Sequence, residues 1–278
     1  MRKLREYLNR PLSFAVFLLI IISTVITALT VVFIIGYIFI KGVPNLSLDL
    51  FSLKYSSSNQ SMLPSIINTV YLTALTLLLA VPIGIFSAIY LAEYSRKNSF
   101  FVKIINIANE TLSGIPSIVY GLFGFLAFVI SKKWGYSLLA GVITLAIMVL
   151  PLIIRTSQEA MLGVDNTFRE ASYGLGAGKL RTVFKIVLPS AMPGILSGII
   201  LAIGRIVGET AALIYTAGTV PEAATKLTSS SRTISVHLYC LLNEGLYTEQ
   251  AYATAVVLIV FVVIINALSN ALAKKIMK

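Results

Sequence analysis

Two charged residues, Arg205 and Glu209, interrupt the apolar stretch of residues 186–220. At about 1.5 Å of rise per residue, Arg205 would lie in the middle to outer half of a membrane-spanning helix that begins near Pro189. A charged side chain at the centre of such a helix costs about 2.5–3.5 kcal/mol on an insertion scale, so it normally faces a partner or a water-filled path. The planar guanidinium of Arg205 matches a tetrahedral oxyanion, and a carboxylate accepts a hydrogen bond from an oxyanion that carries a proton. We therefore expect this pair to lie on a substrate path or at its gate.

The pair also has a purely structural interpretation, in which the two charges neutralise each other and ease insertion of the helix. Residues four apart share a helical face, which allows such a pair. Two features favour a functional role. Arg before Glu is the less favoured order, and Gly204 and Gly208 beside the pair permit close approach by another helix. Because Glu209 would repel a fully deprotonated anion such as sulfate, phosphate is the favoured ligand, since it keeps a proton near neutral pH.

The composition places the chain in a membrane. Of its 278 residues, 57% are hydrophobic and 12% are charged, against roughly 45–50% and about 25% in a soluble domain. So few charges cannot coat a water-exposed globule, which excludes a cytosolic enzyme and a secreted domain. The net charge of +11 does not indicate nucleic-acid binding, because the basic residues flank apolar stretches. The single cysteine, Cys240, and the single histidine, His237, exclude a disulfide framework and a multi-cysteine or histidine-based metal site.

Six charge-poor windows predict six transmembrane helices, because about 20 apolar residues in a helix cross a bilayer. The windows lie at residues 11–40, 64–92, 111–131, 134–154, 186–220 and 250–273. They lack the alternation of a β-barrel, so the predicted fold class is an all-α membrane protein. With the N-terminus inside, the inner segments hold 15 Lys and Arg residues and the outer segments hold 6, which predicts that both termini are cytoplasmic. The inner residues include Arg2, Lys3, Arg5, Arg10, Arg96, Lys97 and Lys278.

The predicted cytoplasmic loop, residues 165–185, contains a helix–glycine–helix pattern. Thr167 followed by Glu170 fits a capping box and predicts a short helix to about Leu175. Gly176 and Gly178 are expected to end this helix in the left-handed conformation.

A second amphipathic segment follows the glycines. Its apolar residues have helical spacing and its basic residues lie on the other face: Leu180, Val183, Phe184, Val187 and Leu188, against Lys179, Arg181 and Lys185. Pro189 is expected to break or kink the chain where it enters the membrane. By composition alone, this loop is either a projecting knuckle or an interfacial helix that anchors the chain.

The spacing in this loop resembles the EAA loop of ABC importer permeases. The family pattern is EAA, three residues, Gly, nine residues and I-x-L-P, and this chain departs from it only in Ser172. The resemblance implies a coupling helix that docks in a groove on a separate ATP-binding subunit. The implied coupling positions are Glu170, Ala171, Gly176, Leu188 and Pro189. Because the sequence has no Walker A motif, we expect ATP and Mg²⁺ to be used by the partner, and this chain to be non-catalytic.

Further stretches resemble the phosphate ABC transporter permeases, most closely the PstA type, with the PstC-type sister as the alternative. These stretches are 89–94 (IYLAEY), 114–124 (GIPSIVYGLFG), 150–156 (LPLIIRT, followed by Glu159) and 203–213 (IGRIVGETAAL). The similarity extends from about residue 64 to residue 218, well over half of the chain.

The resemblance implies a type I ABC importer permease (MetI-like) bundle. Residues 1–63 would form a cytoplasmic segment, the first transmembrane helix and an outer loop, and residues 64–278 a core of five transmembrane helices with a coupling loop at about 165–188. The implied function is the permease subunit of an ATP-driven importer of inorganic phosphate in a prokaryotic inner membrane. The implied partners are two copies of an ATP-binding subunit, a second permease and an extracytoplasmic phosphate-binding protein.

Two other residues are marked by the sequence. Asn68, in the second predicted helix, is a candidate for the substrate path, although a hydrogen bond to a neighbouring helix is the simpler explanation. Pro116 is expected to kink the third helix.

Three rival functions remain. A permease for molybdate, sulfate or an organic substrate is disfavoured by the Arg205–Glu209 pair. An ion-gradient transporter without an ATPase leaves the EAA-like loop unexplained, and a membrane scaffold needs no charges in mid-membrane.

Overall fold

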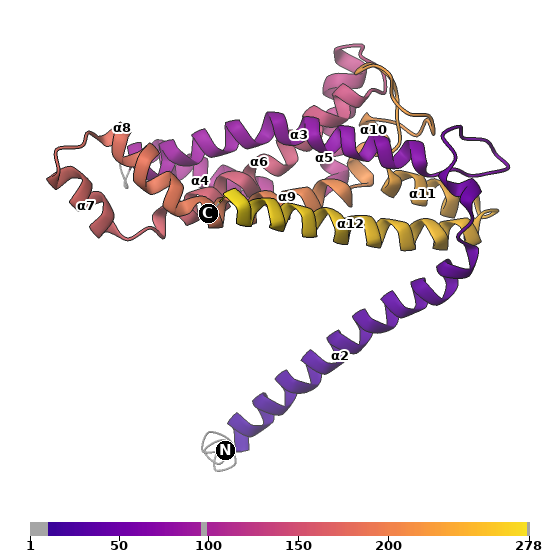
Figure 1. Ribbon diagram of the computed structural model, residues 1–278, viewed down its shortest axis with the longest axis horizontal. Coiled ribbons are helices and arrows are strands. Elements are labelled where there is room, and N and C mark those ends of the chain that lie inside the picture. The colour runs from indigo at the N-terminus through magenta and orange to yellow at the C-terminus, as the bar shows by residue number, and fades with distance from the viewer. Residues whose placement is uncertain (1–10, 96–98, 277–278) are drawn as a thin grey trace.

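The computed structural model describes residues 11–95 and 99–276. Its α-helices are α2 (Pro11–Gly42), α3 (Leu63–Ile89), α4 (Phe100–Ser113), α5 (Ser117–Gly124), α6 (Leu138–Leu162), α7 (Asn166–Gly174), α8 (Lys179–Thr182), α9 (Leu188–Val207), α10 (Ala211–Thr216), α11 (Ile234–Glu244) and α12 (Thr248–Ile276) (Figure 1). Short 3₁₀ turns at Val43–Asn45 and Leu48–Phe51 follow α2, and π-helical segments occur at Tyr90–Tyr94, Phe125–Ser131 and Val183–Val187. No strand occurs in these two ranges, so the all-α prediction is confirmed for them. The basic residues Arg2, Lys3, Arg5, Arg10, Arg96, Lys97 and Lys278 lie outside the described residues.

Helices α3, α6 and α9 form the centre of the bundle, and α6 packs against both of the others. The main apolar cluster joins side chains from each helix, including Leu72 of α3, Leu145 of α6 and Ile206 of α9, all fully buried. A second cluster, around Met161 and Val187, lies where α6 meets the start of α9. We call the end of the bundle that carries α7 the α7 end, and the opposite one the α11 end (Figure 1).

Five helices are long and apolar enough to cross a membrane, and a sixth span results if the bent pair α4 and α5 is counted as one. The six-span prediction agrees with this count. The third span is nevertheless not the single helix predicted at residues 111–131, because α4 ends at Ser113 and the chain turns by 102° before α5. Pro116 stands in extended backbone at the start of α5, so the predicted kink is a complete break. The Tyr120 hydroxyl donates to the Leu112 carbonyl near this break, at 2.8 Å.

The fifth predicted span is also shorter than expected. Helix α9 ends at Val207 rather than continuing toward residue 220, and the short α10 follows after a turn at Gly208. In the other direction, the helix extends back through the π-helical segment to Lys179. Pro189 therefore does not break the chain, because the wider turn that precedes it lets one helical span continue past a residue without an N–H group.

Helix α2 leaves the bundle and meets it only near the α11 end (Figure 1). Its contact there is with α12, where the Tyr37 and Tyr252 rings pack edge to face at 5.9 Å and Gly42 lies against the Tyr252 backbone. None of the residues in its most apolar stretch is buried within this chain. Helix α3 begins at Leu63, next to the predicted boundary between residues 63 and 64, but the division into two parts remains a prediction.

The close packing of α6 on α9 gives a test of the fold. A side chain at Gly198 would overlap that of Thr156, whereas one at Gly36 on α2 would meet nothing within 4 Å. We expect Gly198→Val to destabilise the purified protein by about 1–3 kcal/mol because the helices must separate. The measurement is the Tm in detergent, with Gly36→Val as the matched control. Equal Tm values for both variants would contradict the packing.

Candidate functional site

A cavity of about 550 Å³ lies between α6, α9 and α12. Its lining residues are Leu152, Ser197, Ile200, Leu201, Gly204, Arg205 and Asn266. The volume falls within the usual range of about 300–1,000 Å³ for ligand pockets, and an apolar wall with a few polar groups is their usual composition. We call it the Arg205 cavity.

Among the residues that the structure describes, Arg205 is the only charged one that lines this cavity. Its side chain is partly exposed, and it forms no hydrogen bond or ion pair with the residues of 11–95 and 99–276. A Cβ atom at Gly204 would meet nothing within 4 Å, so the neighbouring space is open. Because an unpaired cation in an apolar wall is costly, this arrangement suits an anion that supplies the missing charge.

Two neutral polar side chains complete the cavity, and sequence reasoning missed both. The Ser197 hydroxyl donates to the Pro193 carbonyl at 2.9 Å, which leaves its oxygen free to accept a hydrogen bond. The Asn266 amide forms no hydrogen bond within the described ranges, so it can both donate and accept. The available signal for Asn266 was an amide inside the last apolar window.

Glu209 does not share a helical face with Arg205, so this part of the sequence prediction is wrong. Helix α9 ends at Val207, and the Glu209 carboxylate turns to accept a hydrogen bond from the Ala212 N–H at 3.0 Å. Its side chain is buried, with 8% of the residue exposed. The free N–H groups at the start of α10 attract a carboxylate, which explains this orientation. Glu209 therefore holds the turn that follows the Arg205 cavity.

Asn68 is fully buried and holds the loop between α10 and α11 rather than lining the Arg205 cavity. Its amide nitrogen donates to the Glu222 carbonyl at 2.9 Å and to the Arg232 carbonyl at 3.2 Å. Its oxygen accepts from the Ala224 N–H at 2.8 Å. The Asn68 amide thus fixes two segments of irregular backbone, both between α10 and α11, against α3.

The loop at the α7 end folds into a projecting knuckle, residues 165–188. Asp165, not Thr167, caps α7: its carboxylate accepts from the Thr167 N–H at 2.9 Å and from the Thr167 hydroxyl at 3.0 Å. These two bonds hold the pKa of Asp165 below its ordinary value. The predicted capping box with Glu170 is therefore wrong, because Asp165 is the first side chain able to reach the free N–H groups.

The two glycines of the knuckle behave differently. Gly176 has a φ of +80°, the left-handed conformation predicted for it, and ends α7 with its N–H donating to the Tyr173 carbonyl at 2.9 Å. Gly178 has a φ of −75° and instead starts α8, so the prediction for it is wrong. Ser172, which replaces the alanine of the family pattern, is buried and pairs with the Thr182 hydroxyl at 2.8 Å. This contact ties α7 to α8.

The predicted coupling residues separate into two groups. Glu170, Ala171 and Gly176 are exposed at the tip of the knuckle, where Leu175 and Leu180 expose 89% and 67% of their surface. A small cavity of about 270 Å³ lies beside them, lined by Ser172, Leu175, Gly176, Ala177, Arg181, Lys185 and Ile186. Leu188 and Pro189 stand instead at the foot of the knuckle, where α9 begins. Exposed apolar side chains beside a glycine turn form a surface suited to another protein.

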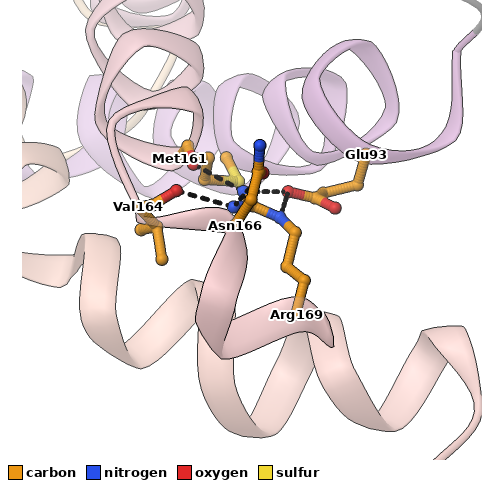
Figure 2. A network of polar contacts seen from close by, with 5 residues as sticks. All are labelled: Glu93, Met161, Val164, Asn166 and Arg169. Carbon is orange, nitrogen blue, oxygen red and sulfur yellow. Dashed lines mark hydrogen bonds and ion pairs between the residues drawn. The ribbon is translucent and has the colours of Figure 1, made fainter. Parts of the chain in front are cut away.

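One polar network, unforeseen from the sequence, fixes the knuckle to the bundle (Figure 2). Arg169 of α7 contacts one Glu93 oxygen through Nε at 3.1 Å and Nη2 at 2.6 Å. The same guanidinium donates to the Val164 carbonyl at 2.7 Å, the Met161 carbonyl at 2.8 Å and the Asn166 side chain at 3.3 Å. Glu93 lies within the matched stretch IYLAEY, but a partner 76 residues away leaves no local pattern.

Comparisons with known proteins agree with this architecture. Residues 80–278 match the family described as binding-protein-dependent transport system inner membrane component. The chain belongs to this family. It is 32% identical over 249 residues to the probable ABC transporter permease YqgI of Bacillus subtilis, covering 83% of this chain and 84% of that protein. It is 35% identical over 230 residues to the phosphate transport system permease PstA of Pasteurella multocida, covering 81% of each.

A solved structure supports the fold of this permease. The chain superimposes on a subunit of a bacterial ABC transporter involved in the import of the polysaccharide alginate, with a TM-score of 0.68, 18% identity and full coverage of both chains. At this identity the likeness concerns the fold alone. The predicted type I importer permease bundle and the resemblance to PstA-type permeases are therefore confirmed.

The role found for Asn68 can be tested directly. Asn68→Ala would remove the partner of the partly buried Ala224 N–H and of the Glu222 and Arg232 carbonyls, at a cost of up to about 1–3 kcal/mol for each group that stays shielded from water. We expect faster proteolysis between residues 218 and 233 in the purified protein and a lower Tm. Asn270→Ala, on the exposed face of α12, is the control. Unchanged proteolysis would show that this amide does not hold the loop.

Proposed function

We propose that this permease is a transmembrane subunit of an ATP-driven importer of inorganic phosphate. The observation that carries the proposal is the unpaired guanidinium of Arg205 in a cavity between membrane helices. The relative in Pasteurella multocida is named as a phosphate transport system permease, which supports the same substrate.

The cavity offers phosphate complementary groups. The Arg205 fork can hold two oxygens of the anion, as guanidinium groups commonly do with phosphate. The phosphate proton needs an acceptor, and the Asn266 carbonyl or the Ser197 oxygen can accept it. Sulfate has no proton to donate at neutral pH, so it would leave these acceptor oxygens without a donor, whereas the amide and hydroxyl could donate to either anion. This preference for phosphate over sulfate replaces the preference ascribed to Glu209 from the sequence.

Glu209 and Asn68 are proposed to act at the gate and not on the anion. Glu209 caps the turn beyond Arg205, and Asn68 holds the outer loop above it. Both are buried, so they set the position of the chain at the α11 end of the path.

The knuckle is proposed to bind the ATP-hydrolysing partner. Glu170, Ala171 and Gly176 would contact a groove on that subunit, whereas Leu188 and Pro189 would join the knuckle to α9. Two copies of the ATPase would serve two permeases, and ATP with Mg²⁺ would be consumed there, not on this chain. The exposed Leu175 and Leu180 supply apolar contact area for docking.

The remaining partners follow from surfaces that this chain leaves uncovered. A second phosphate permease would close the Arg205 cavity and cover α2, and an extracytoplasmic phosphate-binding protein would dock at the α11 end. The membrane is a prokaryotic inner membrane, with both termini cytoplasmic. The asymmetry of 15 inner against 6 outer basic residues supports this orientation.

The role of Arg205 predicts a loss of phosphate affinity. In the complex reconstituted with its partners, Arg205→Ala should raise the phosphate concentration for half-maximal uptake about 10- to 100-fold, as expected for a lost charge-assisted hydrogen bond. Arg205→Lys, which keeps the charge without the fork, should be intermediate. Lys132→Ala is the control, and parallel assays with sulfate and molybdate test selectivity. Uptake that is unchanged in Arg205→Ala, or stimulated equally by sulfate, would contradict the proposal.

The role of the knuckle predicts a loss of coupling. Gly176→Val would place a β-branched residue at a φ of +80°, which costs about 1–2 kcal/mol and distorts the end of α7. We expect weaker co-purification of the ATPase subunit and reduced uptake, while Gly174→Ala, at a position with open space and ordinary backbone, should behave as wild type. Normal uptake by Gly176→Val would exclude this turn from coupling.

A further inference from the structure

Helix α7 is held to the rest of the chain by two different polar contacts. One is the Ser172–Thr182 hydroxyl pair, at 2.8 Å, which leads through α8 into α9. The other is Arg169, which reaches Glu93 at the end of α3 and two carbonyls at the end of α6 (Figure 2). In residues 11–95 and 99–276, no other side chain of α7 bonds to α3 or its π-helical extension.

The Arg169 contact is rigid and shielded from solvent. The side chains of Arg169 and Glu93 are 14% and 6% exposed, and their closest approach is 2.6 Å. All three guanidinium nitrogens of Arg169 donate. Nε and Nη2 donate to Glu93, Nη2 also donates to the Met161 carbonyl, and Nη1 donates to the Val164 carbonyl. A planar fork that is engaged on several sides holds its orientation, which a single lysine ammonium does not.

The two contacts lead to different helices that line the Arg205 cavity. The Arg169 contact reaches Met161 on α6, and Leu152 of the cavity wall lies about 14 Å further back along this helix. Helix α3 packs closely on α6, because Gly84 lies directly against Ile153. The Ser172 contact leads through α8 to α9, which carries Arg205, and Lys179 at the start of α8 also lies over the Tyr94 ring at 4.9 Å.

We propose that Arg169 and Glu93 form the joint that passes a displacement of α7 to α3 and α6, and so to one wall of the Arg205 cavity. The inference rests on the proposed function, in which an ATPase acts on α7. Arg169 and Glu93 are positioning residues, because they lie at the α7 end and do not line the cavity. When α7 moves, the joint carries α3 and α6 with it while the other contact carries α9. Without the joint, α7 keeps its chain connection to α6 through residues 163–165 and its Ser172 contact toward α9, but it loses its direct side-chain link to the end of the α3 span, so hydrolysis drives the cavity less effectively.

The experiment measures the number of phosphate ions imported per ATP hydrolysed by the complete complex in vesicles. Glu93→Gln removes the charge at nearly constant shape, and Arg169→Lys keeps the charge but loses the fork. In both variants we expect the ATPase subunit to co-purify and hydrolysis to continue, while the ratio falls about 5- to 10-fold. The double variant should be no worse than the more affected single one, because both changes break the same contact.

The matched control is Glu159→Gln. Glu159 also pairs with an arginine, Arg155, at 2.9 Å, but within α6 and with both side chains more than half exposed. This pair does not connect different helices, so its loss should leave the number of phosphate ions imported per ATP at the wild-type value. A merely structural defect would lower uptake and hydrolysis together and leave the ratio unchanged.

Three results would overturn the proposed role of Arg169 and Glu93. They are a wild-type number of phosphate ions per ATP in Glu93→Gln, additive decreases of this number in the double variant, or loss of the ATPase subunit from a variant with wild-type Tm. The last would mean that Arg169 shapes the docking surface instead. If Glu93→Gln does not fold, the ratio measured for Arg169→Lys decides. Failure of the proposed function is visible separately, because the wild-type chain would then import phosphate without ATP or bind no ATPase.

Discussion

A guanidinium that leaves bulk water is stabilised by oxygen partners, and the two arginines on which the proposals rest differ in where those partners come from. Arg169 receives its partners entirely from within the chain, from Glu93 and two main-chain carbonyls, so its orientation is fixed. Arg205 receives none from the described residues and faces a cavity. A satisfied arginine joins elements, whereas an unsatisfied one leaves binding capacity for an anion. The cost of removing a guanidinium from water thus accounts both for the proposed joint at Arg169, at the α7 end, and for the proposed binding group Arg205 in the cavity.

The same need for partners applies at the two points where the helices break, and a side chain satisfies one backbone group at each. At the turn before α5, the Tyr120 hydroxyl donates to the carbonyl of Leu112. At the turn after α9, the Glu209 carboxylate accepts from the Ala212 N–H. Irregular backbone is tolerated at membrane depth only where such partners are supplied. Glu209 therefore belongs to the architecture of the broken span, and the proposed anion site comprises Arg205 and its neutral neighbours.

The sequence allowed the spans and the knuckle to be predicted because their constraints are local. Span length is set by the bilayer, and the left-handed turn at Gly176 is set by a residue that lacks a Cβ atom. Helix ends were harder, since Asp165 and Thr167 are both good caps and only the fold decides between them. The end of α9 at Val207 and the partners of Asn68 depend on contacts with distant segments. The Glu93–Arg169 pair is the extreme case, because two ordinary surface residue types become informative only when the chain brings them together.

The contacts at the foot of the knuckle also bear on how a small motion can open a path. Charge-assisted bonds from a planar fork resist rotation more strongly than a single contact between neutral hydroxyls. Helix α7 is therefore coupled stiffly to α3 and α6 through Arg169, and more loosely to α9 through Ser172. Under the proposed coupling, a force on α7 would therefore reach α3 and α6 more directly than α9. Since the Arg205 cavity is lined by α6, α9 and α12, unequal displacement of these helices would change its width, within the limit set by the close packing of Gly198 on Thr156.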